Sequence, residues 1–263
     1  RLAAAIFALG VWFSLLSPPI AAQQPPHRLS DAELERIGRR IWQNECAGTV
    51  EGLTSWNAGE DFASLGIGHF IWYPAGKDGP FEESFPKLIA WFRQTGVEMP
   101  RWLLTTPDCP WPDRASFLND RNSPRMQELR ALLARTVKEQ TLFIIARLDE
   151  AAPRLQAAAG RSAARVARNM QLLRQSAAGN FAMIDYVNFK GEGLNPRERY
   201  KGEGWGLLQV LMTMEARDAA DAPRAFSAAA QEVLRKRVKN SPPERGEQRW
   251  LAGWLNRCRS YVQ

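Results

Sequence analysis

The sequence predicts an α+β fold that is predominantly helical, with a small β-hairpin lobe near its N-terminal end and a larger helical lobe after it. Two observations support this prediction. Short extended runs punctuated by glycine are confined to residues 56–73, and most of the chain after residue 123 has helical patterning with abundant alanine. The chain of 263 residues is long enough to bury a sizeable core, so we expect one domain with two lobes.

The first 22 residues differ in composition from the rest of the chain. A basic residue, an apolar run and a short stretch of small residues follow one another, which is typical of a secretory signal peptide. The alternative is an uncleaved membrane anchor, and either reading restricts membrane contact to this segment. We therefore expect an exported, periplasmic protein with a leader at 1–22, a linker at 23–29 and the folded domain at 30–263.

The folded domain is expected to begin with a helix that ends near Glu45. Ser30 is a good N-cap residue and Glu33 follows three positions later, which is a capping box. Apolar residues then recur at helical spacing from Leu34 to Ile41, and Glu45 is the next position of this stripe. A carboxyl group on the buried face, at the negative end of the helix dipole, is better placed to donate a proton than one in solvent.

Later helices are expected in seven further stretches beyond a short one around 88–92. A Pro-rich connection is predicted between Pro100 and Pro112. The predicted helices are 123–149, 151–159, 161–177, 179–188, 205–218, 223–239 and 243–261.

Charge and composition restrict the partners and cofactors. The net charge of +7 suits a polyanionic partner, but no dense basic run interleaved with aromatics is present, so we expect no nucleic-acid site. Only two His and no C-x-x-C motif are available, so we expect no metal site and no cofactor. Cys46 and Cys109 could form a disulfide, with Cys258 left over, or all three cysteines could be free.

A Gly-rich extended segment after the first helix carries the most informative motif. Residues 62–70 place Gly66, Gly68 and His69 where glycine lets another backbone or a ligand approach closely. A helix that ends in Glu, followed by a hairpin with Ser-x-Gly-x-Gly-His, resembles the active-site lobe of the phage-type lysozymes. That resemblance implies that Glu45 is the general acid, that Ser64 takes the place of the family's Thr, and that Gly66, Gly68 and His69 support the hairpin.

The resemblance continues towards the C-terminus. Residues 182–193 look like the family's central helix beside the cleft, which places Asn188 at the substrate. Residues 240–245, followed by a Trp-containing helix, look like the turn whose Arg faces the catalytic Glu, which implies this position for Arg245. These segments cover the two ends of the domain and leave 75–178 without a counterpart.

The second carboxylate departs from the family pattern. The spacer after Glu45 is longer than in the family, and we choose Glu60, next to a predicted turn, over Asp61 or no second acid. Glu51 also mimics a family motif but lies off the helical stripe. Without a second acid the reaction would be lytic transglycosylation. Gln209 lies in a segment that resembles one of the transglycosylases. For the structure we favour a buried helix with Gln209 satisfied by local hydrogen bonds, from which it could still reach the cleft.

The expected function is that of a muramidase, a glycoside hydrolase cleaving β-1,4 linkages of peptidoglycan or a related amino-sugar polymer. The basic surface suits peptide stems that carry carboxylates, and the flat rings of Trp56, Trp72 and Tyr73 could stack on sugars. Two other functions stay open. The domain could bind the wall polymer without cleaving it, or it could be a scaffold in an envelope complex.

Overall fold

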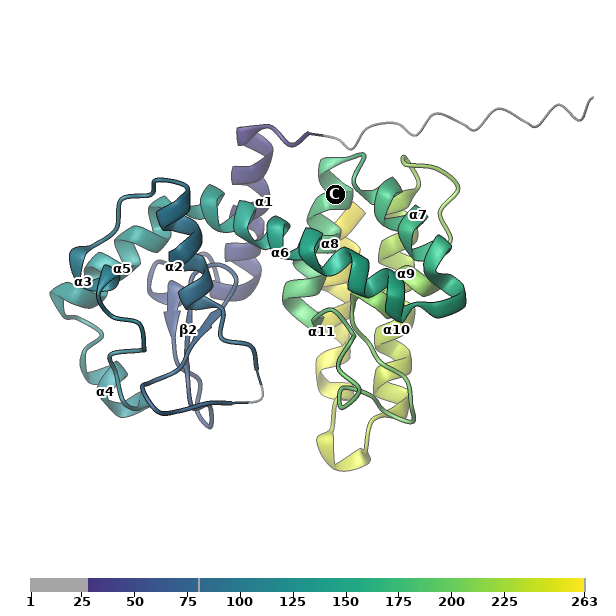
Figure 1. Cartoon of the computed structure of the whole chain (residues 1–263). Coiled ribbons are helices and arrows are strands. Elements are labelled where there is room, and N and C mark those ends of the chain that lie inside the picture. The colour runs from purple at the N-terminus through teal and green to yellow at the C-terminus, as the bar shows by residue number, and fades with distance from the viewer. Residues whose placement is uncertain (1–27, 80, 263) are drawn as a thin grey trace, which may run out of the picture.

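The computed structural model describes residues 28–79 and 81–262. The predicted leader at 1–22 and most of the linker lie outside these residues. The described chain forms eleven α-helices and one small antiparallel sheet, which confirms the predicted, mainly helical α+β class. In Figure 1 the sheet and helices α1 to α5 form one lobe, called here the sheet lobe (28–135). Helices α7 to α11 form the helical lobe (163–262), and α6 (Val137–Ala158) runs between the two.

Helix α1 (Asp31–Cys46) has the predicted capping box. The Ser30 amide donates to Glu33 Oε2 at 2.8 Å, and the Glu33 amide donates to Ser30 Oγ at 3.3 Å. The helix ends at Ala47, whose φ of 52° is left-handed, rather than at the glycine that follows. Glu45 therefore lies in the last turn.

The sheet has three strands in the order β1 (Thr54–Ser55), β2 (Ala63–Leu65) and β3 (Phe70–Trp72). Ser55 pairs with Ser64, and Ser64 pairs with Ile71. The sheet thus begins two residues earlier than the predicted hairpin region. The turn between β2 and β3 contains both predicted glycines and His69.

The helical boundaries differ from the prediction in two ways. The predicted helix 123–149 breaks at Thr136, whose hydroxyl donates to the Leu132 carbonyl at 2.8 Å, and α6 then continues through Pro153. The predicted helix 205–218 forms only over α9. The other helices are α2 (Phe85–Gln94), α3 (Arg101–Leu104), α4 (Arg114–Asn119), α5 (Pro124–Arg135), α7 (Ala163–Leu173), α8 (Ala177–Lys190), α9 (Leu207–Thr213), α10 (Ala222–Asn240) and α11 (Gln248–Arg259).

Helix α1 packs directly on α6, which fixes its last turn between the lobes. A Cβ atom at Gly38 would lie 2.4 Å from Thr141 Oγ1 and 2.5 Å from Val137 Cγ1. Glycine at this position therefore sets the close approach of the two helices.

The three cysteines, Cys46, Cys109 and Cys258, are free and buried, so the structure contains no disulfide between Cys46 and Cys109. Within residues 28–79 and 81–262, none of the helices combines the length and apolarity that a membrane span needs.

Candidate active site

Glu45 belongs to a buried hydrogen-bond and ion-pair network that joins the two lobes. Its carboxylate forms an ion pair with Arg257 of α11, and the same guanidinium donates to both oxygens of Asp185 of α8, at 2.8 Å each. Tyr261 donates to Asp185 Oδ2 at 2.8 Å, and Asn44 donates to Oδ1 at 3.0 Å. We call these five residues the interlobe network. It is assembled from α1, α8, α11 and the short 3-10 turn Ser260–Val262 that follows α11.

The charges of the network hold Arg257 firmly in its ionised form. Burial disfavours the guanidinium, but the hydrogen bonds and negative charge of Asp185, together with Glu45, raise the pKa of Arg257 above its ordinary value. Burial also raises the pKa of the Tyr261 hydroxyl, and the charge of Asp185 adds to this.

His69 contacts Glu45 from the sheet lobe. Its Nδ1 atom lies 3.8 Å from Glu45 Oε2, and the side chains are 32% and 14% exposed, respectively. The turn that carries His69 is fixed from α6, because Gln140 accepts a hydrogen bond from the Ile67 amide at 2.9 Å. Gly66 has a φ of 70°, and a Cβ atom there would lie 2.3 Å from Gln140 Oε1. Glycine is therefore required for this turn to reach α6.

Cys46, His69 and Glu45 also form a chain with the order of a thiol-nucleophile triad. The Cys46 sulfur lies 3.7 Å from His69 Nε2. However, the thiol is buried and donates to the Gly66 carbonyl at 3.6 Å. Burial, with a smaller effect of the Glu45 charge, raises the pKa of Cys46 to about 12. A thiol that is not ionised at neutral pH is a poor nucleophile, so this arrangement does not point to thiol chemistry.

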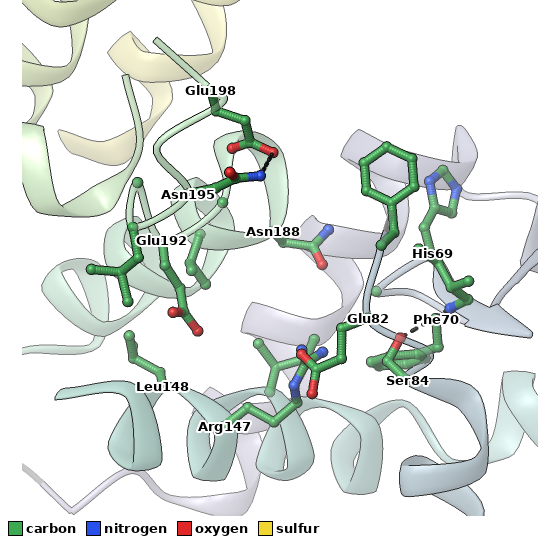
Figure 2. A pocket seen from close by; sticks show the side chains of 18 of the residues that line it. His69, Phe70, Glu82, Ser84, Arg147, Leu148, Asn188, Glu192, Asn195 and Glu198 are labelled. Atoms are coloured by element: carbon green, nitrogen blue, oxygen red, sulfur yellow. Dashed lines mark hydrogen bonds and ion pairs between the residues drawn. The ribbon is translucent and has the colours of Figure 1, made fainter. Parts of the chain in front are cut away.

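A cleft of about 460 Å³ lies between the lobes, and His69 and Asn188 line it. Figure 2 shows Glu82 and Ser84 on the side of the sheet lobe, Glu192 and Glu198 on the side of the helical lobe, and Arg147 with Leu148 of α6 along the floor. Glu82 pairs with Arg147 at 2.8 Å, and Glu192 pairs with Arg154 at 3.2 Å. The cleft is therefore polar, and each wall is tied to α6 by an ion pair.

The three aromatic residues expected to stack on sugars are in the core. Trp56, Trp72 and Tyr73 are 4%, 1% and 5% exposed. The Trp56 ring packs edge-on against Phe117, and Trp72 packs against Phe85. Their faces are covered by the protein, which corrects the expectation that they contact the substrate.

The predicted hairpin residues are separated from one another. Glu60 lies in the turn between β1 and β2, where Asn57 donates to its carboxylate at 3.1 Å. Ser64 is buried in the middle of β2. The β2 strand runs from the Glu60 turn to Gly66, so Glu60 lies at the opposite end of the hairpin from the turn that meets α1.

The two predicted residues beyond α8 do not face Glu45. Gln209 caps α9, accepting from the Gly206 amide at 2.9 Å and donating to the Gly193 carbonyl at 3.1 Å, in keeping with the local interpretation. Arg245 is 54% exposed at its side chain and lies 3.3 Å from Glu247. Arg257 occupies the position opposite Glu45 that the resemblance implied for Arg245, which corrects that assignment.

The sequence reasoning missed Arg257, Asp185 and Glu82. A signal for Asp185 was available, because it is a single acid within an otherwise apolar stretch of α8 and must find a partner when buried. Arg257 offered no such signal, since α11 contains several arginines.

No group of three or more potential metal ligands occurs within the described part of the chain. Comparisons with protein-family models, with curated proteins and with solved structures find no match to this chain.

Proposed function

We propose that this protein is a lysozyme-like enzyme that cleaves the β-1,4 linkages of peptidoglycan or a related amino-sugar polymer, with Glu45 as the general acid. The observation that carries the proposal is the position of Glu45. Its carboxyl group is mostly buried, held by an arginine from the other lobe, and in contact with a histidine that lines the cleft between the lobes. A polymer laid along this cleft would contact His69, and Glu45, which is not itself one of the lining residues, lies next to that histidine.

In this mechanism Glu45 donates its proton to the oxygen of the glycosidic bond as the bond to the anomeric carbon breaks. Arg257 and His69 restrict the orientation of the carboxyl group from two sides, so that the proton points along one direction. A water molecule then attacks the anomeric carbon and gives its proton to a second carboxylate. The acids that line the cleft, Glu82, Glu192 and Glu198, are better placed to be that base than Glu60.

Lytic transglycosylation is the second candidate reaction. It is favoured by the engagement of Glu60 in its own turn, since that acid was the second carboxylate expected from the sequence. In this reaction Glu45 first protonates the leaving oxygen. A hydroxyl group of the sugar then attacks its own anomeric carbon and gives its proton to the Glu45 carboxylate, so one acid is sufficient. The product is an anhydro sugar, which is lighter than the hydrolysis product by one water.

Digestion of purified peptidoglycan sacculi tests the proposal. We expect soluble glycan fragments from the full chain, and mass spectrometry of their reducing ends distinguishes hydrolysis from transglycosylation. If a preparation that binds sacculi releases no soluble fragments between about pH 4 and 8, the enzyme proposal is contradicted and the protein is a wall-binding module. Export through a signal peptide at 1–22 belongs to the same proposal and is tested by N-terminal sequencing of the secreted protein.

A further inference from the structure

Phe81 is an exposed aromatic residue on the wall of the cleft. Its side chain is 51% exposed, and only Val262 equals this value among the large apolar residues that the structure describes. Full burial of such a side chain would be favourable by about 1.5–3 kcal/mol. Single exposed apolar residues are common on protein surfaces, so the inference depends on the position of Phe81 at the cleft and on the residues around it.

The ring of Phe81 is held in place by two other aromatic rings. Phe62 meets it edge to face at 5.8 Å and 74°, and Tyr73 meets Phe62 in the same way at 5.3 Å and 69°. The Tyr73 hydroxyl also donates to the Phe81 carbonyl at 3.5 Å. Beside this contact, about half of the surface of Phe81 stays open to solvent (51%).

The opposite wall offers polar groups. Asn188, Asn195 and Glu198 line it, and Asn195 donates to Glu198 at 3.5 Å, as Figure 2 shows. A pyranose ring has an apolar face of C–H groups and a rim of hydroxyl and amide groups. An aromatic face on one wall and amide groups on the other match both parts. Asn195 already has partners in the protein, since it also accepts from the Arg197 amide at 2.9 Å, so Asn188 is the amide that a polar ligand would satisfy.

We propose that Phe81 forms a sugar-binding subsite of the cleft. Its exposed ring stacks on one pyranose ring of the glycan, while Asn188 bonds to the hydroxyl or acetamido groups of that ring. This subsite rests on the proposed function, because that function supplies the amino-sugar polymer as the occupant. The rings that the sequence suggested for this role, Trp56 and Trp72, are covered by the core.

Calorimetry with a soluble N-acetylglucosamine hexamer tests the subsite in a Glu45→Gln background, where turnover does not interfere. We expect Phe81→Ala to weaken binding about 2- to 12-fold, since an aromatic stacking contact is worth about 0.5–1.5 kcal/mol. Phe81→Trp should bind at least as tightly as the parent. Trp250→Ala is the matched control, because Trp250 is an exposed aromatic residue of α11 that does not line the cleft.

Thermal melting shows whether each variant is folded, and an exposed ring should be dispensable for stability. Unchanged hexamer affinity in Phe81→Ala, no binding by the parent, or an equal loss in Trp250→Ala would overturn the subsite. Cleavage of sacculi by the otherwise native chain decides the proposed function separately. If the protein binds the hexamer through Phe81 but does not cleave sacculi, the subsite proposal is supported and the proposed enzymatic function is contradicted.

Discussion

Buried carboxylates are paired with arginine at both ends of α11, but they are satisfied in different ways. Glu247, at the N-terminal end of α11, accepts two hydrogen bonds from Arg237 at 2.8 Å, one from Tyr200 at 2.9 Å and one from Arg245 at 3.3 Å. We call these four residues the Glu247 cluster. All of them belong to the helical lobe.

The interlobe network at the other end of α11 contains Glu45 from the sheet lobe, and a single arginine serves two carboxylates. The Glu247 cluster has three donors for one acid and lies within one lobe, which is the pattern of a structural element. The difference predicts that replacing Arg257 costs more stability than replacing any arginine of the Glu247 cluster, and under the proposed function it leaves Glu45 as the reacting acid.

Arg257→Met should have the largest effect on stability. The substitution leaves the fully buried Asp185 without its bidentate partner, which typically costs about 3–5 kcal/mol. Urea unfolding of wild type and variant measures this loss. A loss below that of the corresponding substitution in the Glu247 cluster would contradict the ranking of the two groups.

Arg237→Met should have a smaller effect, of about 1–3 kcal/mol, because Tyr200 and Arg245 continue to donate to Glu247. The same urea experiment measures it. Arg245→Met is the matched control, and we expect it to change stability by about 1 kcal/mol or less, since the side chain is half exposed. Equal losses in the two variants would show that Glu247 does not depend on its bidentate partner.

The pKa of Lys190 depends on arginines of both the Glu247 cluster and the interlobe network. Its Nζ atom lies 3.6 Å from the Trp254 ring centroid and 3.9 Å from that of Phe189. Both rings favour the ammonium form, but burial, followed by the charges of Arg237 and Arg257, lowers the pKa of Lys190 to about 7, against a smaller opposing effect of Glu247 and Cys258.

This shift predicts a pH dependence of stability. Between about pH 7 and 10.5 the unfolded chain binds a proton at Lys190 that the folded chain does not, so this residue makes stability rise with pH in that window. Lys190→Met should remove the rise, as measured by urea unfolding at several pH values. An unchanged pH profile would mean that Lys190 titrates like a solvent-exposed lysine.

Local patterns in the sequence predicted the first helix and the position of its acid, because a capping box and a stripe of apolar residues involve neighbours in the chain. The partners of that acid were not predictable in the same way. Arg257 and Asp185 are 72 residues apart, and only the packing of α8 against the C-terminal segment brings them together. Trp72 is a residue type that often stacks on sugars, but its ring is buried because α2, which carries Phe85, packs against the sheet.

The role of Glu45 as proton donor is tested most directly by comparing Glu45→Gln with Glu51→Gln on purified sacculi. Glu51 is an exposed acid six positions later, in a segment that also mimics the family's motif, so it is the matched control. We expect Glu45→Gln to slow release of soluble glycan by about 10²–10⁴-fold with the fold retained, and Glu51→Gln to cleave like wild type. Wild-type cleavage by Glu45→Gln, or loss of cleavage in Glu51→Gln alone, would contradict the assignment.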